Sequence, residues 1–230
     1  MPFPLIFVAL AVVVTGIAGA LAFDPSRGGT VTFWAIEGVP TIAMAVAAGY
    51  WAKREELLRT WLTPRWGDFT RGVVGALVLF ASAWGFVHWL APVGSSREIW
   101  LVTLYGQIGD PRVLQSHGAQ VGGAIMVLAV AEEVLWRGLV TTVIADRVGT
   151  RTAWIWAAGL YALAQVPTMW PLRATTGVGS LDPILPIAAL GAGLVLGAMA
   201  KAFGRLAPGI LAHALFDWTV VMMFPLWGMH

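Results

Sequence analysis

Long apolar runs dominate the chain, and short polar segments separate them. A helix needs about 20 apolar residues to cross the hydrocarbon core of a bilayer. These runs are continuously apolar, whereas the strands of a membrane barrel would alternate, so helices are expected. Windows of this length predict an all-α, polytopic transmembrane bundle of about seven spans, at roughly residues 2–22, 31–52, 72–92, 119–144, 152–168, 183–202 and 206–228.

The basic residues in the loops predict the orientation of this bundle. One set of alternating loops contains nine of them, namely Lys53, Arg54, Arg59, Arg65, Arg71, Arg147, Arg151, Lys201 and Arg205. The other set contains four, namely Arg27, Arg97, Arg112 and Arg173. Because cytoplasmic loops carry the excess of Lys and Arg, we expect the N-terminus in the cytoplasm and the C-terminus outside it.

Composition supports a membrane protein and excludes several other classes. Hydrophobic residues make up 58% of the 230 residues and charged residues only 11%, whereas soluble domains contain about 25% charged residues. The absence of cysteine excludes disulfides and thiolate chemistry. Since the basic residues lie in loops and not on one face, no nucleic-acid surface is predicted. We expect a single integral membrane domain over residues 1–230, in contact with the lipid bilayer.

Two loops and one glycine-rich run carry further expectations. The basic, amphipathic cytoplasmic loop 53–71 predicts either a helix in the headgroup layer or an ordinary amphipathic loop. Residues 93–117 predict a re-entrant segment or an extracytoplasmic cap. Gly191, Gly193 and Gly197 in the sixth predicted span favour close helix packing.

Three charged residues interrupt the fourth apolar run. Glu132, Glu133 and Arg137 occur in the sequence Ala-Glu-Glu-Val-Leu-Trp-Arg-Gly, and charges at membrane depth mark functional sites by default. Glu133 and Arg137 are four residues apart with the acid first, so they share a helix face. Glu133 can then neutralise Arg137, which leaves Glu132 to point into a cavity and activate water. The alternative is a structural ion triad that fixes helix packing.

The last span contains a second polar pair, His213 and Asp217, again four apart and on one helical face. The aspartate can fix the tautomer of the imidazole, so that the other ring nitrogen serves a substrate oxyanion, a water or a metal. The alternative is a buried histidine that is hydrogen-bonded for packing. The acidic residues on another span favour one shared cavity.

These motifs together resemble a known family. They look like the CPBP family of CAAX prenyl proteases and bacteriocin-processing intramembrane proteins, also called the ABI family. The motifs that carry the resemblance all lie in apolar helices: Glu-Glu-x-x-x-Arg followed by Gly138, an aromatic-x-x-x-polar element about 25 residues later, and then His-x-x-x-Asp. The similar region spans about residues 118–220 and would be the catalytic core. Residues 1–117 would supply the N-terminal spans.

The resemblance implies an intramembrane glutamate endopeptidase that needs no cofactor and no metal. Glu132 would be the general base, with Glu133 and Arg137 as its structural support. His213 and Asp217 would stabilise the oxyanion. The substrate would be a membrane-anchored protein or peptide, cut near its C-terminal or transmembrane segment. The short seven-span form resembles prokaryotic members, which places the protein in a prokaryotic cytoplasmic membrane, in an unknown oligomeric state.

The second motif departs from the family pattern. The family has Phe-x-x-x-His, whereas this chain has Tyr161-Ala-Leu-Ala-Gln165. Glutamine can position a water but cannot take up a proton as imidazole does, so Glu132 would act as base alone. With one histidine left, the residues also fit a zinc site poorly.

Gln165 therefore keeps a second functional class open, a catalytically impaired protease-like scaffold or regulator. A small transporter is a third class, but the repeats expected of many carriers are missing. Two other residues have alternative interpretations. Glu37 could line the cavity or a lateral gate, and the favoured expectation is a solvated position near the outer interface. His88 is expected to be an interfacial anchor beside Trp89.

Overall fold

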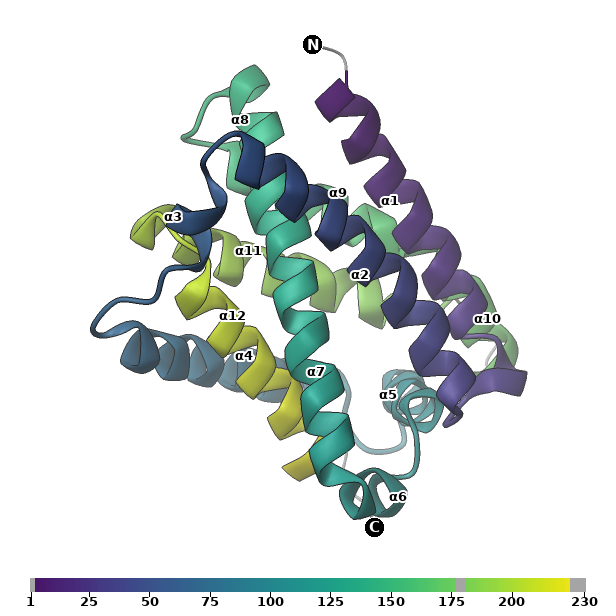
Figure 1. Ribbon diagram of the computed structural model, residues 1–230. Coiled ribbons are helices and arrows are strands. Elements are labelled where there is room, and N and C mark those ends of the chain that lie inside the picture. Colours follow the sequence, from purple (N-terminus) through teal and green to yellow (C-terminus); the bar gives the residue numbers. More distant parts are fainter. Residues whose placement is uncertain (1–2, 177–180, 224–230) are drawn as a thin grey trace.

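The computed structural model describes residues 3–176 and 181–223, which form helices and no strand (Figure 1). The prediction of an all-α bundle is confirmed. The elements are α1 (Phe3–Ala22), the 3₁₀ turn η1 (Pro25–Arg27), α2 (Val31–Arg54), α3 (Leu58–Leu62), α4 (Asp68–Leu90), α5 (Ser96–Ile108), α6 (Pro111–Ser116), α7 (Gly118–Glu132), the π-helix η2 (Glu133–Val140), α8 (Thr141–Val148), α9 (Ala153–Gln165), the 3₁₀ turn η3 (Val166–Thr168), α10 (Met169–Thr176), α11 (Ile184–Phe203), α12 (Ala207–Trp218) and the π-helix η4 (Thr219–Met223).

Four of the described helices are long and apolar enough to cross a membrane by length and composition, namely α1, α2, α4 and α11. The other three predicted spans are also helical. The fourth contains the charged residues and consists of α7, η2 and α8. The fifth is α9, which has only 13 residues, and the seventh is formed by α12 and η4. That these three cross the bilayer stays a prediction.

Local sequence signals explain where several helices begin and end. The hydroxyl of Thr30 accepts a hydrogen bond from the Phe33 amide and begins α2, and Ser95 begins α5 in the same way. Helix α11 ends at Gly204, which has a φ of 66°, a left-handed conformation that glycine adopts without strain. The polar segments therefore act as caps between the apolar runs.

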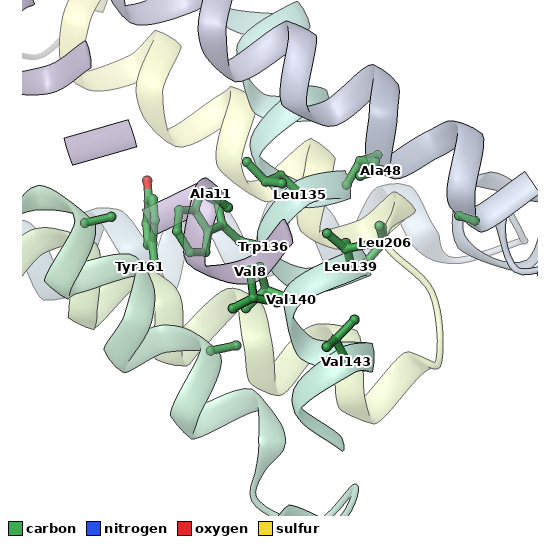
Figure 2. Close-up of a cluster of buried hydrophobic side chains, with 14 of the residues drawn as sticks. Val8, Ala11, Ala48, Leu135, Trp136, Leu139, Val140, Val143, Tyr161 and Leu206 are labelled. Atoms are coloured by element: carbon green, nitrogen blue, oxygen red, sulfur yellow. The ribbon is translucent and has the colours of Figure 1, made fainter. Parts of the chain in front are cut away.

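The main core surrounds η2. Its side chains Leu135, Trp136, Leu139 and Val140 are at most 2% exposed, and they pack in one cluster with Val8 and other residues of α1, α2, α8 and α9 (Figure 2). In Figure 1, α7 leads into this cluster between α2 and α12, and it contacts both. The charged residues of η2 are consequently held by the best-packed part of the molecule.

Small residues allow two helix pairs to approach closely. A Cβ on Gly193 of α11 would lie 2.9 Å from the Cβ of Ala158 on α9, and one on Gly72 of α4 would lie 2.7 Å from the side chain of Leu211 on α12. Gly197 also faces α9, at Trp154, but a Cβ on Gly191 would meet nothing within 4 Å. The predicted close packing of the sixth span therefore depends on Gly193 and Gly197 and not on Gly191.

The loops assemble in two groups. On one side, the carbonyl of Trp61 accepts from the Leu206 amide at 2.9 Å, and Asp68 Oδ2 accepts from Arg205 Nε at 2.9 Å. On the other side, the Gly29 amide donates to the Gln107 carbonyl at 2.9 Å. Loops with the same predicted sidedness are thus in contact, as expected when successive spans alternate in direction. Which side faces the cytoplasm stays a prediction.

The segment 53–71 fits the second of its two predicted forms, an amphipathic loop, better than a helix in the headgroup layer. It contains only the five-residue helix α3 among turns and irregular structure. Trp61 of α3 is 7% exposed and belongs to the main core, where its ring packs against the backbone of Gly138. Further along, Trp66 is fully exposed and Phe69 is exposed. The basic loop is therefore anchored to the core by one aromatic side chain. Residues 93–117 form α5 and α6.

Candidate active site

The first motif lies where an α-helix becomes a π-helix. Glu132 is the last residue of α7, and Glu133 is the first of η2, whose eight residues are all buried. Where the helix returns to the α form, the Thr141 hydroxyl donates to the Trp136 carbonyl, five residues earlier, at 2.9 Å. The sequence predicted one uninterrupted helix here and missed the π-helix. Short π segments inside α-helices are frequently found at functional sites.

Glu133 is the centre of a buried ion network. Its side chain is 0% exposed, and its Oε1 lies 3.1 Å from Arg137 Nη1. The same oxygen is 3.0 Å from His213 Nδ1. Space for this carboxylate comes from α12, because a Cβ on Gly209 would lie only 3.2 Å from Glu133 Oε2. Glu133 therefore joins η2 to α12.

His213 has carboxylates on both sides of its ring. A carboxylate oxygen only accepts, so Nδ1 carries a proton that it donates to Glu133. Its Nε2 lies 3.4 Å from Asp217 Oδ2 and 3.8 Å from Glu132 Oε2, which is longer than an ordinary N–H···O hydrogen bond. The expectation that Asp217 fixes the tautomer is wrong, because Glu133 takes that position. Asp217 instead lies beside the nitrogen that faces Glu132.

Exposure divides the three carboxylates into two kinds. The side chains of Glu132 and Asp217 are 21% and 35% exposed, whereas that of Glu133 is fully buried. Water and substrate can therefore reach Glu132 and Asp217 but not Glu133. This arrangement suits a reactive role for Glu132 and a positioning role for Glu133.

Tyr161 is a site residue whose role the sequence argument missed. Its hydroxyl donates to Glu132 Oε2 at 2.6 Å. Its ring lies 4.8 Å from the guanidinium carbon of Arg137 and 5.1 Å from the ring of Trp136. The sequence feature that could have revealed this role is the tyrosine in place of the family phenylalanine, because a buried phenol needs a hydrogen-bond partner that phenylalanine does not need.

Gln165 lies in front of α1. A Cβ on Gly19 of α1 would be 3.7 Å from Gln165 Oε1 and 3.9 Å from Glu37 Oε2, so both side chains reach the same point of α1. Within the described residues, Gln165 makes no hydrogen bond with Glu132 or His213. Glu132, His213 and Asp217 therefore come together directly, and Gln165 is the neighbour of Glu37.

The favoured position of Glu37 is wrong. Its Oε2 is excluded from solvent, and the carboxylate is close enough to Glu132 to interact with it electrostatically. Glu37 therefore lies on the interior side of α2 and not in a solvated position at the outer interface. The alternative expectation, that it lines the cavity, describes its placement better.

The other histidines lie outside this cluster or outside the described residues. His88 is exposed on α4, where its ring stacks on Trp84 at 5.0 Å, and His117 is exposed before α7. His230 lies outside the described residues. Within residues 3–176 and 181–223, no three His, Asp or Glu side chains are arranged to hold a metal ion. The metal-free chemistry stays a prediction.

One comparison with known proteins found a relationship. Residues 116–219 match the family described as Type II CAAX prenyl endopeptidase Rce1-like. The matched segment runs from before α7 to the beginning of η4, so it includes Glu132, His213 and Asp217. Comparisons with the curated proteins and with the solved structures found no match. The resemblance to the CPBP family is therefore confirmed for this part of the chain: residues 116–219 are similar to the Rce1-like family, within a protein whose apolar helices indicate an integral membrane protein.

Proposed function

We propose that this protein is an intramembrane endopeptidase in which Glu132 activates the attacking water. The observation that carries the proposal is a partly exposed carboxylate at the edge of a buried ion network. Glu132 accepts a hydrogen bond from Tyr161 at 2.6 Å and lies 3.8 Å from His213 Nε2, while Glu133 and Arg137 are enclosed behind it. The Rce1-like match supports the same class of activity.

Glu132 acts as the general base. Its carboxylate takes a proton from water, and the water oxygen forms a bond to the peptide carbonyl carbon. The π electrons of the carbonyl move to its oxygen, which becomes an oxyanion. General-base catalysis of this kind contributes roughly 10²–10⁴-fold to rate. The Tyr161 hydroxyl keeps the carboxylate in one orientation while the other carboxylate oxygen meets the water.

His213 stabilises the oxyanion. Because Glu133 accepts from Nδ1, the imidazole is held with Nε2 directed toward Glu132 and Asp217. With both nitrogens protonated, Nε2–H donates to the oxyanion, and the positive charge opposes the charge that develops there. Asp217 lies beside this nitrogen and holds the imidazolium in place. Glu133 and Arg137 position His213 and touch no substrate.

The substrate we propose is a membrane-anchored protein or peptide that is cut near its C-terminal or transmembrane segment. A site among apolar helices suits a chain that is already in the bilayer. We place the protein in a prokaryotic cytoplasmic membrane with its N-terminus in the cytoplasm, as the basic loops indicate. Residues 118–220 would be the catalytic core.

A second candidate is a protease-like scaffold or regulator with impaired turnover. The observation that favours it is Gln165, which replaces the family histidine and makes no hydrogen bond with Glu132. In a scaffold of this kind the ion network would be retained for folding, and the protein would bind a membrane partner without cutting it.

A library of membrane-anchored reporter peptides separates the two candidates. Purified wild type, Glu132→Ala and Gln165→His would each be incubated with the library in detergent, and products would be identified by mass spectrometry. Glu55→Ala is the matched control, because Glu55 is exposed at the far end of α2. The protease account predicts cleavage by wild type and by the control but not by Glu132→Ala. Cleavage by Gln165→His alone would support the scaffold.

A further inference from the structure

Glu37 is a partly buried acid that the proposed mechanism does not use. Its Oε2 is excluded from solvent and has no hydrogen-bond partner within the described residues. Glu133 also has one such oxygen, Oε2, but its Oε1 pairs with Arg137 and His213. A buried carboxylate oxygen without a partner is destabilising, so its presence in an apolar helix calls for a functional reason.

The surroundings of Glu37 connect it to the site. It interacts electrostatically with Glu132, and it shares the space in front of Gly19 with the amide of Gln165. That space exists because α1 presents bare backbone there: a Cβ on Gly19 would lie 2.8 Å from Thr168 Cγ2. Helices α1, α2 and α9 therefore bring one carboxyl group and one amide together, next to the proposed base.

We propose that Glu37 is a further catalytic residue, the general acid that protonates the leaving amine. This inference rests on the proposed function. Two carboxyl groups that interact, one of them with an oxygen excluded from solvent, favour holding one proton between them. When Glu132 accepts the proton from water, Glu37 is the neighbour that still has one to give.

The proton balance of the reaction closes with Glu37 in this role. Collapse of the tetrahedral intermediate re-forms the carbonyl π bond and breaks the C–N bond, whose electrons go to nitrogen. The nitrogen takes the proton of Glu37, which becomes a carboxylate. Glu132, protonated in the first step, then returns a proton to Glu37. One water has been consumed, and both acids are in their starting states.

Gln165 is the polar neighbour of Glu37 in this scheme, since both side chains lie in front of Gly19. Its amide cannot itself transfer a proton. The chain thus has an ionisable group on α2 next to the position where the family pattern has histidine. Acid catalysis is supplied by Glu37.

The charged groups of the packed elements determine the pH profile. Helix α7 contributes Glu132, and η2 contributes Glu133 and Arg137, which pair with each other; α1 has no charged residue. A general acid must be protonated, so kcat should fall on the alkaline side. The mechanism also needs His213 with both ring nitrogens protonated, so without Glu37 the alkaline limb that remains should be that of His213 alone.

The kinetic test compares Glu37→Gln with wild type on a reporter that wild type cleaves. The expected result is a kcat lowered by roughly 10²-fold, an unchanged KM and an alkaline limb that changes position, because only His213 still contributes to it. Glu55→Gln, the same change at the far end of α2, should behave as wild type. The double variant Glu37→Gln with Gln165→His should regain part of kcat, because imidazole can carry the proton. A single variant with the wild-type kcat and pH profile would overturn the proposal.

A spectroscopic test needs no substrate and separates this inference from the proposed function. The infrared difference between wild type and Glu37→Gln at neutral pH should contain the C=O stretch of a neutral carboxylic acid. A difference spectrum without that band would overturn the proposal even if the protein is a protease. If wild type cleaves no reporter, the endopeptidase assignment fails, whereas the band still decides whether Glu37 holds the proton. The thermal midpoints of both proteins should agree, because the amide matches the neutral acid in shape.

Discussion

Changing Glu133 to Gln tests the division of roles between the two adjacent glutamates. The substitution keeps the shape of the side chain and an oxygen that can accept from His213 Nδ1, at 3.0 Å in the wild type. It removes the negative charge that lies 3.1 Å from Arg137. The guanidinium side chain is 3% exposed, and neither of its terminal nitrogens has a well-aligned hydrogen bond, so its charge would lose its close anionic partner.

The size of the effect follows from this burial. Removing one partner of a buried ion pair costs about 3–5 kcal/mol, because the other charge is left uncompensated. For a chain of this length, each kcal/mol shifts the unfolding midpoint by roughly 2–4 °C. We therefore expect Glu133→Gln to lower the midpoint by on the order of 6–20 °C. The ring of Tyr161, 4.8 Å from the Arg137 guanidinium carbon, offsets only a small part of this loss.

Thermal unfolding in detergent, followed by tryptophan fluorescence, measures the effect, and Glu132→Gln is the matched control. The side chain of Glu132 is 21% exposed and pairs with no arginine, so this variant should lose no more than about 1 kcal/mol, the value of one ordinary hydrogen bond. The reasoning is refuted if the two variants shift the midpoint equally, or if Glu133→Gln shifts it by no more than the control.

Three further outcomes follow from the packing and the loops. Gly193→Ala should lower the free energy of unfolding by about 1–3 kcal/mol, because the new methyl group overpacks against α9. Gly191→Ala should not lower it, because a Cβ there meets nothing within 4 Å. Thermal unfolding midpoints of the two variants measure the difference. Asp68→Asn should destabilise the protein by about 3 kcal/mol, since Arg205 loses a nearly buried ionic partner, and cleavage per folded molecule at low temperature should be unchanged. Burial raises the pKa of Asp182, which lies outside the spans, from 3.8 to about 6. The folded state therefore loses stability as pH rises through this range. Asp182→Asn should flatten that part of a curve of unfolding free energy against pH.

The helices could be predicted from the sequence because each apolar run has only one way to satisfy its backbone in lipid. The pairing of Glu133 with Arg137 followed from their spacing alone. The proximity of Glu132, His213 and Asp217 was predicted from their chemistry, since charges in separate apolar helices lower their cost by meeting. The geometry confirms this proximity, while the catalytic roles of the three residues stay a proposal.

Other features depend on contacts between distant segments, which spacing does not reveal. The π-helix arises where η2 is enclosed on all sides, so its backbone is decided by packing. Trp61 fills the space in front of Gly138, which the pattern of the 53–71 loop does not reveal. Glu37 was expected to be solvated because nothing in α2 shows which face meets α1. The hydroxyl of Tyr161 reaches Glu132, a contact that the second motif does not reveal.

The rate of peptide cleavage by Glu132→Gln tests the central claim most directly. Single-turnover rates on a membrane-anchored reporter would be measured for wild type, for this variant and for the exposed control Glu55→Gln, all at a temperature where each protein is folded. The account predicts a rate lowered at least about 100-fold for Glu132→Gln and unchanged for the control. A Glu132→Gln protein that cleaves at the wild-type rate would contradict the assignment of Glu132 as the base.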